Sequence, residues 1–257
     1  MSCRVNRADD ADGAEQTLEN PNELKWAKGG DLRRINGVGI LLSRLRPRHF
    51  WSDQDVSTSE SPAGTSTTDM KFHDPEHKFE RNYWGDCTNT FMEEQKHFVQ
   101  ARLMGIKING CSLDAMGKRI LDIGGGPVSM LLKTQNLAFG MVCDPITYPA
   151  WVYERYRAKG IICLIQSGEH VISFGWDEVW IYNVLQHCMD PKKVIDNARK
   201  AAPLIRIFEW IDFPPHQGHP QMLTESALNS WLGGTGVVKN LAEPGLHGKS
   251  YSGVFRT

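Results

Sequence analysis

The chain has 257 residues, of which 40% are hydrophobic, and a formal net charge of −1 at pH 7. This size and composition predict one globular domain with an appendage, and the balanced charge gives no electrostatic reason to expect a nucleic-acid partner. The six cysteines form no CxxC pair, which favours reduced cysteines in a cytoplasmic protein over a zinc site or a disulfide framework. No apolar run approaches the ~18 residues of a membrane span, and no signal-peptide region is evident, so we expect no membrane contact.

The N-terminal part of the chain differs in composition from the rest. Residues 52–69 consist mainly of Ser, Thr and Asp, which bury too little apolar surface to offset the entropy lost on ordering. We therefore interpret residues 1–71 as a mostly disordered leader and linker, and residues 72–116 as a helical extension that could cover a ligand site. Within this extension, residues 89–105 have apolar side chains at helical spacing and end at a glycine, which predicts a single helix.

Residues 117–257 show strands that alternate with short helices. Strands are predicted at 119–123, 137–144, 161–166, 177–185 and 204–212. Helices are predicted at 127–135, 149–160, 190–202 and 223–234. Two more strands, 236–243 and 249–257, follow without a helix between them. The pattern predicts an α/β fold with a doubly wound, mostly parallel seven-stranded sheet, Rossmann-like, that ends in an antiparallel edge hairpin.

The sequence RILDIGGGPVSMLL, residues 119–132, marks the expected ligand site. Three glycines, Gly124, Gly125 and Gly126, end the first strand, where doubly wound sheets bind ligands. A dinucleotide fingerprint would need glycine at Ser129, and Asp122 would stand close to an anionic pyrophosphate. A carboxylate there suits a cationic ligand such as S-adenosylmethionine, which carries a sulfonium and an amino group, and glycines let the backbone approach it closely.

With the residues that follow it, this turn resembles the first motif of the class I S-adenosylmethionine-dependent methyltransferases. Asp144, at the end of the second strand, resembles the acid of that family that binds both ribose hydroxyls. The segments 167–169 and 176–187 are similar to the motifs that follow the third strand and contain the fourth strand. The resemblance implies cofactor contacts from nine residues: Asp122, Gly124, Gly125, Gly126, Asp144, Pro145, Gly168, Glu169 and Asn183.

The resemblance also implies in-line methyl transfer, in which proximity and orientation supply most of the rate and a general base assists a hydroxyl acceptor. His187 is the first candidate for that base, followed by His97, Glu209 and His216. The pair His216 and His219 provides too few ligands for a metal site, so no metal is expected.

The expected acceptor is a small molecule such as a sugar or other metabolite. Asn183 is followed by Val-Leu-Gln, so the Asn-Pro-Pro-Tyr motif of amino-methylating DNA enzymes is missing, and so is the Pro-Cys pair of C5-cytosine enzymes. The segment 79–105 is a candidate lid, with Tyr83, Trp84, Asn89 and Thr90 placed to contact an acceptor. Two alternatives remain open: an NAD-dependent oxidoreductase on the same sheet, and a non-catalytic methyltransferase-like binding protein.

Overall fold

The computed structural model of the chain describes residues 75–171, 175–243 and 245–257. The leader and linker predicted for residues 1–71 lie outside these residues. No helix in the described part of the chain is both long and apolar enough to cross a bilayer.

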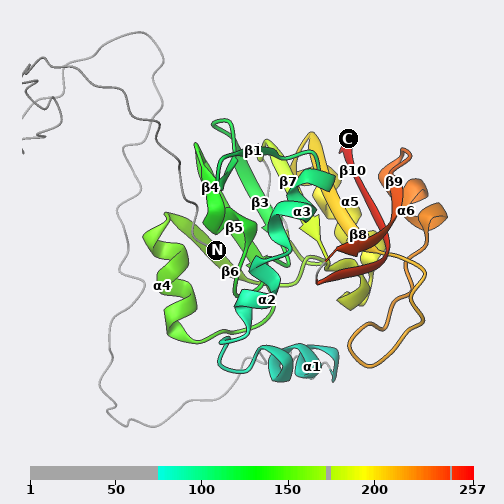
Figure 1. The fold of residues 1–257 in the computed structure, drawn as a ribbon, viewed down its shortest axis with the longest axis horizontal. Coiled ribbons are helices and arrows are strands. Elements are labelled where there is room, and N and C mark those ends of the chain that lie inside the picture. The colour runs from blue at the N-terminus through cyan, green and yellow to red at the C-terminus, as the bar shows by residue number, and fades with distance from the viewer. Residues whose placement is uncertain (1–74, 172–174, 244) are drawn as a thin grey trace, which may run out of the picture. The chain divides into compact units, whose positions relative to one another are not determined.

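A seven-stranded sheet forms the centre of the fold (Figure 1), in the order β6-β5-β3-β7-β8-β10-β9. The strands are β3 (Arg119–Ile123), β5 (Phe139–Asp144), β6 (Ile161–Ile165), β7 (Glu178–Tyr182), β8 (Leu204–Trp210), β9 (Val237–Glu243) and β10 (Leu246–Arg256). Neighbours from β6 to β8 pair in parallel, whereas β10 is antiparallel to both β8 and β9. The predicted fold class and its edge hairpin are therefore confirmed.

Three helices connect these strands close to the predicted positions: α4 (Ala150–Ala158), α5 (Pro191–Ala201) and α6 (Glu225–Leu232). Their ends follow the expected capping chemistry. The side chains of Asp190 and Thr224 accept hydrogen bonds from the first turns of α5 and α6, and Gly233 ends α6 with a left-handed φ of 70°.

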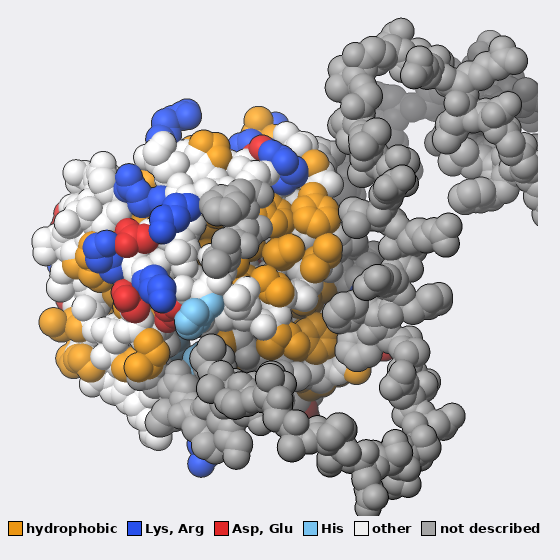
Figure 2. Space-filling view, turned by 180° about the vertical axis from the view of Figure 1, so that it is seen from behind, with side chains coloured by type: hydrophobic (Ala, Val, Ile, Leu, Met, Phe, Trp, Pro, Cys, Tyr) orange, Lys and Arg blue, Asp and Glu red, His pale blue; other side chains and the backbone are white. Residues whose placement is uncertain are grey.

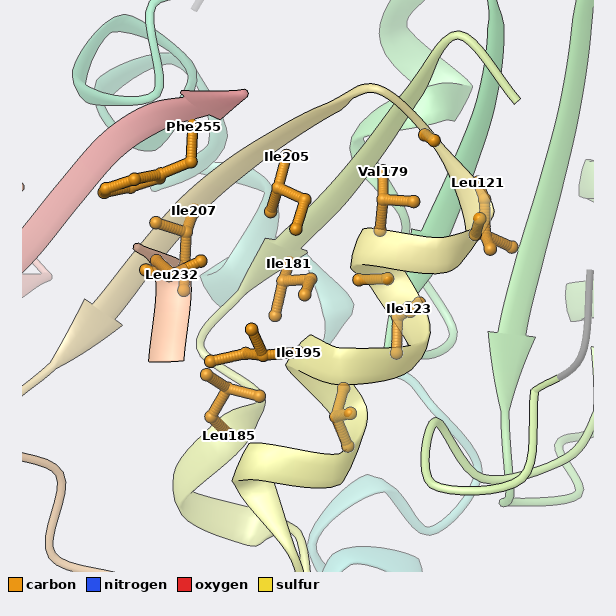
Figure 3. Packing of buried hydrophobic residues seen from close by; sticks show 14 of the residues in the cluster. Leu121, Ile123, Val179, Ile181, Leu185, Ile195, Ile205, Ile207, Leu232 and Phe255 are labelled. Atoms are coloured by element: carbon orange, nitrogen blue, oxygen red, sulfur yellow. The ribbon is translucent and has the colours of Figure 1, made fainter. Parts of the chain in front are cut away.

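Both faces of the sheet are packed. Alternate strand residues such as Leu121, Ile123 and Ile181 point to α5 and α6 and form one core, shown in Figure 3. The intervening residues, including Ile120 and Trp180, pack with α4 and the N-terminal helices as a second core. Full burial of such side chains stabilises the fold by about 1.5–3 kcal/mol each.

The N-terminal extension is only partly helical. It contains α1 (Pro75–Trp84), α2 (Thr90–Glu94) and α3 (His97–Leu103), so the single helix predicted over 89–105 is interrupted. At the break, the Lys96 N–H donates to the Glu93 carbonyl at 2.9 Å, a tighter turn than an α-helix makes. The strands β1 (Lys107–Asn109), β2 (Ser112–Asp114) and β4 (Thr134–Gln135) form a small sheet that the sequence did not predict.

The helix predicted over residues 127–135 is wrong. Only a single 3₁₀ turn, Met130–Lys133, follows the glycines, and the chain then enters β4. Ser129 is extended, with φ −62° and ψ 148°, and its hydroxyl accepts from the Leu131 N–H. Pairing of β4 with β2 in parallel uses the residues that a longer helix would need.

Figure 2 shows the face seen from behind in Figure 1. On part of it, Lys and Arg side chains are interspersed with Asp and Glu side chains, and hydrophobic side chains gather on a neighbouring part. On this face, the described residues form no extended area of one charge.

Candidate functional site

A cavity of about 430 Å³ lies at the carboxyl ends of β3, β5, β6, β7 and β8, within the size range of small-molecule sites. Its walls come from the segments that follow these strands and from the three N-terminal helices. This is the sheet edge at which doubly wound folds bind ligands. Of the nine predicted cofactor contacts, the structure places eight on this wall: Gly124, Gly125, Gly126, Asp144, Pro145, Gly168, Glu169 and Asn183.

The glycine turn presents backbone to the cavity because its missing side chains would point into the protein. A Cβ on Gly124 would come within 2.5 Å of Val184, and one on Gly125 within 2.6 Å of Asp122 Oδ2. Gly126 is different: it has a φ of 62°, and its Cβ would meet nothing closer than 3.8 Å. Tight packing therefore requires Gly124 and Gly125, whereas backbone conformation favours glycine at Gly126.

Asp122 is completely buried and does not line the cavity. Its Oδ2 accepts hydrogen bonds from the hydroxyls of Ser129 and Tyr182, the latter at 2.7 Å, while Oδ1 has no hydrogen-bond partner. Burial raises the pKa of Asp122 to about 7, although both hydrogen bonds oppose the shift. The structure thus places this carboxylate directly behind the glycine turn and not on its open side.

Three hydroxyls hold the segment that replaces the predicted helix. The Ser129 N–H donates to Tyr156 at 2.7 Å, the Met130 N–H to Tyr182 at 2.9 Å, and the Leu131 N–H to Ser129 Oγ at 2.9 Å. The Tyr156 hydroxyl also donates to the Gly126 carbonyl at 2.8 Å. These side chains satisfy backbone donors that would otherwise point from a helix N-terminus, so the turn lacks the helix dipole that attracts phosphates.

Asp144 stands at the end of β5 beside the glycine turn. Its Oδ2 accepts from the Gly126 N–H at 3.0 Å, and its Oδ1 accepts from the Ile146 N–H at 2.9 Å and the Tyr148 hydroxyl at 3.0 Å. Burial raises the pKa of Asp144 to about 6 against the effect of these bonds. All three donors are neutral, and Pro145 continues the cavity wall.

Gly168 and Glu169 line the cavity after β6. A Cβ on Gly168 would lie 2.8 Å from Ile123, so close packing requires the glycine here too. Glu169 Oε1 accepts from the Met189 N–H at 3.0 Å, and Asn197 donates to the Gly168 and Glu169 carbonyls. Glu169 therefore has a structural role that the sequence did not indicate, in addition to its place on the wall.

Asn183 and His187 follow β7. Asn183 has a φ of 56°, and its Oδ1 accepts from Gln186 at 3.0 Å. His187 Nδ1 lies 2.7 Å from the Gly218 carbonyl and 3.1 Å from Glu80 Oε1 of helix α1. Its ring centroid is 4.4 Å from that of His219, and both rings line the cavity.

The other candidate bases have different surroundings. Glu209 is fully buried behind the cavity wall, where it accepts from the Val184 and Leu185 N–H groups, and burial raises its pKa to about 7. Burial and two nearby lysines lower the pKa of His97 to about 3. His216 lines the cavity and pairs with His219 through both backbone hydrogen bonds of a tight turn.

Helix α1 supplies three cavity residues that the sequence did not single out: His77, which precedes the predicted lid 79–105, and Phe79 and Glu80, which lie within it. Tyr83 and Trp84, which were predicted to contact an acceptor, also line the cavity, whereas Asn89 and Thr90 do not. The unpredicted residues lie far in sequence from the residues they face, and no local pattern marks such pairs. In the described part of the chain, no group of three or more His, Cys, Asp or Glu side chains could hold a metal ion.

No family model matches the sequence, and no curated protein is significantly similar to it. Solved structures, however, share the fold. The N-methyltransferase NodS from Bradyrhizobium japonicum, in complex with S-adenosyl-L-homocysteine, is 15% identical with a TM-score of 0.50, over 71% of this chain and 97% of that one. Magnesium protoporphyrin IX methyltransferase from Synechocystis, with bound S-adenosylhomocysteine, is 14% identical with a TM-score of 0.50, over 71% and 96%.

A third structure, a methyltransferase from Thermotoga maritima described as a possible histamine N-methyltransferase, is 14% identical over 52% of this chain with a TM-score of 0.37. The chain spans 61% of that protein's length. The two fuller matches show that this chain has the fold of class I S-adenosylmethionine-dependent methyltransferases, as the resemblance implied.

Proposed function

We propose that this protein, which has the class I methyltransferase fold, transfers a methyl group from S-adenosylmethionine to a small molecule. The observation that carries the proposal is the charge around the glycine turn. Asp122 and Asp144 flank the turn, and their hydrogen-bond donors are all neutral. Two buried carboxylates whose described donors are uncharged favour a cationic ligand and oppose a pyrophosphate, although the nearby His77 imidazole lowers the pKa of Asp144.

The residues on the wall fit such a ligand. Asp144 would accept a hydrogen bond from a ribose hydroxyl, because a carboxylate offers about four acceptor positions and three are in use. Gly168 and Glu169 would border the adenine, and the backbone of Gly124–Gly126 would support the amino-acid end. Asp122 would act from behind the turn by its charge and by holding Ser129, and not by direct contact.

When bound, S-adenosylmethionine supplies an electrophilic methyl group whose carbon–sulfur bonding pair stays on sulfur when the acceptor attacks. The chain orients the acceptor and excludes water with the aromatic side chains of Phe79, Tyr83 and Trp84. His187 is the base that takes the acceptor's proton. A sugar or another metabolite remains our expectation for the acceptor, and the cytoplasmic location stays a prediction.

One of the two alternatives is less well supported. The missing helix after the glycine turn removes the dipole on which a dinucleotide's pyrophosphate would rest, and this weakens the oxidoreductase hypothesis. A non-catalytic binding protein would keep the same cofactor wall, so only turnover separates it from an enzyme.

Calorimetry with three ligands tests the proposal. We expect S-adenosylmethionine and S-adenosylhomocysteine to bind with dissociation constants near the micromolar range, about −8 kcal/mol, and NADH not to bind. Tighter binding of NADH would exclude the methyltransferase. Formation of S-adenosylhomocysteine on a panel of small hydroxyl and amino compounds then distinguishes an enzyme from a binding protein.

A further inference from the structure

The clearest feature outside the cofactor wall is the contact between helix α1 and the ring of His187. Glu80 and the turn 216–219 reach His187 from two separate parts of the chain. Phe79 packs against the same turn so closely that a Cβ on Gly218 would lie 2.4 Å from its ring. Of two consecutive residues of α1, Phe79 therefore packs against the turn 216–219, and Glu80 contacts the His187 ring.

Both contacts are made to the same ring nitrogen. Nδ1 of His187 lies 2.7 Å from the Gly218 carbonyl oxygen and 3.1 Å from Glu80 Oε1, and both oxygens only accept hydrogen bonds. Nδ1 therefore carries the proton whether the ring is neutral or charged. The nitrogen that titrates is Nε2, for which the described residues provide no hydrogen-bond partner.

We propose that Glu80 is a positioning residue that, together with the Gly218 carbonyl, fixes the tautomer of His187, so that Nε2 is the basic atom on the acceptor side of the cavity. This inference rests on the proposed methyltransferase function. It deepens that function, because an acceptor hydroxyl needs a base and Nε2 can take its proton. Helix α1, which belongs to the N-terminal extension, thereby becomes part of the active site.

The charges around the ring agree with this role. Burial lowers the pKa of His187, but Glu80, the Gly218 carbonyl and Glu209 outweigh that effect and raise it. The neighbouring His219 has its pKa lowered to about 4 by burial and by the imidazoles of His187 and His216. His219 therefore stays neutral near pH 7, and His187 is the residue that takes up the acceptor's proton.

The test uses the full chain with ¹⁵N-labelled histidine, and long-range ¹H–¹⁵N spectra followed through a pH titration. His187→Asn identifies the His187 signals among those of the nine histidines. We expect the Nδ1–H tautomer in neutral His187, and a midpoint that falls to lower pH in Glu80→Gln. Glu94→Gln is the matched control, because Glu94 pairs with Arg155 at 3.0 Å and does not line the cavity.

A neutral His187 that carries its proton on Nε2 would overturn the inference, and so would an unchanged midpoint in Glu80→Gln. Neither result depends on the cofactor. Calorimetry of the same samples with S-adenosylmethionine reports separately on the proposed function, so its failure is distinguishable from failure of the tautomer assignment.

Discussion

Buried carboxylates have opposite surroundings at the two ends of the strands in the central sheet. The carboxyl ends, which border the cavity, are called the carboxyl edge or ligand edge below, and the amino ends, where Glu178 lies, the saturated edge. Glu178 begins β7 on the same face of the sheet as Asp122 and is 2% exposed. It is paired with the cations of Lys118 and Arg206 and accepts from the Trp180 indole at 2.9 Å. Burial raises the pKa of Glu178, but these partners outweigh it and the pKa is lowered.

At the carboxyl edge, the hydrogen-bond donors described for Asp122, Asp144 and Glu209 are neutral. Burial raises the pKa of each, although the His77 charge opposes the shift at Asp144 and the His187 charge opposes it at Glu209. Glu178 is saturated by protein cations, and its network also binds the end of α3 through Arg206 and the Met104 carbonyl. Glu178 is thus neutralised within the protein, whereas we expect a bound cation to stabilise the charged forms of the acids at the carboxyl edge.

The largest effect should come from removing the charge of Glu178, which is paired with cations at the saturated edge. Glu178→Gln removes the charge between two cations, and loss of one partner from a buried ion pair typically costs about 3–5 kcal/mol of unfolding free energy. Urea unfolding measures this change. Asp177→Asn, next in sequence, breaks an exposed pair with Arg119 and should cost about 1 kcal/mol. Equal losses in the two variants would contradict the contrast between buried and exposed pairs.

The second effect concerns the ligand edge. Asp144→Ala removes one charge-assisted bond to ribose, or two where the Tyr148 hydroxyl gives way, and each is worth about 1.5–3 kcal/mol, so cofactor affinity should fall by about tenfold for one bond and about a thousandfold for both in calorimetry. Asp144→Asn keeps the shape and one acceptor and should lose less. Asp144 also accepts hydrogen bonds from Gly126, Ile146 and Tyr148, so we expect a lower melting temperature in Asp144→Ala as well.

Unchanged affinity in Asp144→Ala, with a lower melting temperature, would leave Asp144 with a turn-stabilising role only. The hypothesis that the ligand edge binds S-adenosylmethionine would then lose its central residue, Asp144.

Local sequence signals predicted the parts of this molecule that local chemistry determines. The strand 119–123 was predicted with the bounds of β3, and the starts of α5 and α6 were predicted to within about two residues. The helix over 127–135 failed because its competitors are distant. Tyr156 and Tyr182, 27 and 52 residues further along the chain, take up the backbone donors of Ser129 and Met130.

The candidate site shows the same division. The glycines were identified from their place after the first predicted strand, and Asp144 from the family resemblance. The reason given for the glycines was only partly right, because packing against Val184 and Asp122 excludes side chains at Gly124 and Gly125. Glu80 was missed because its partner, His187, is more than a hundred residues away. No periodicity or spacing links a helix surface to a loop at that distance.

The third effect concerns pH: the stability contributions of Asp122 and Glu178 should change with pH in opposite directions. The pKa of Asp122 is about 7 in the folded protein and 3.8 as a free side chain, so between these values the folded state holds a proton that the unfolded state has released. Its contribution to stability is therefore present below pH 3.8 and is lost as pH rises to about 7. Glu178, with a lowered pKa, contributes stability above pH 4.5 that is lost as pH falls.

Unfolding free energies from pH 3 to 8 check this. Asp122→Asn should remove a decline between about pH 4 and 7, because its amide oxygen can still accept from Ser129 and Tyr182 but does not titrate. Glu178→Gln should remove a rise at the acid end. Identical pH slopes in the two variants would mean that the two edges do not differ in the way described.

The smallest effect separates two roles of Tyr148, which lines the cavity and is 8% exposed. Its hydroxyl donates to Asp144 Oδ1 at 3.0 Å and occupies one of about four acceptor positions on that carboxylate. Two ribose hydroxyls need two positions, and only about one is left beside the Gly126, Ile146 and Tyr148 donors.

If the tyrosine competes with ribose, Tyr148→Phe should tighten cofactor binding by up to about tenfold, since one hydrogen bond is worth about 0.5–1.5 kcal/mol net. Tyr153→Phe is the control, because Tyr153 accepts from the Tyr148 N–H at 2.9 Å and its removal leaves the three donors of Asp144 in place. Weaker binding in Tyr148→Phe alone would contradict competition between Tyr148 and ribose for Asp144. It would show instead that the Tyr148 hydroxyl orients Asp144 for the ligand.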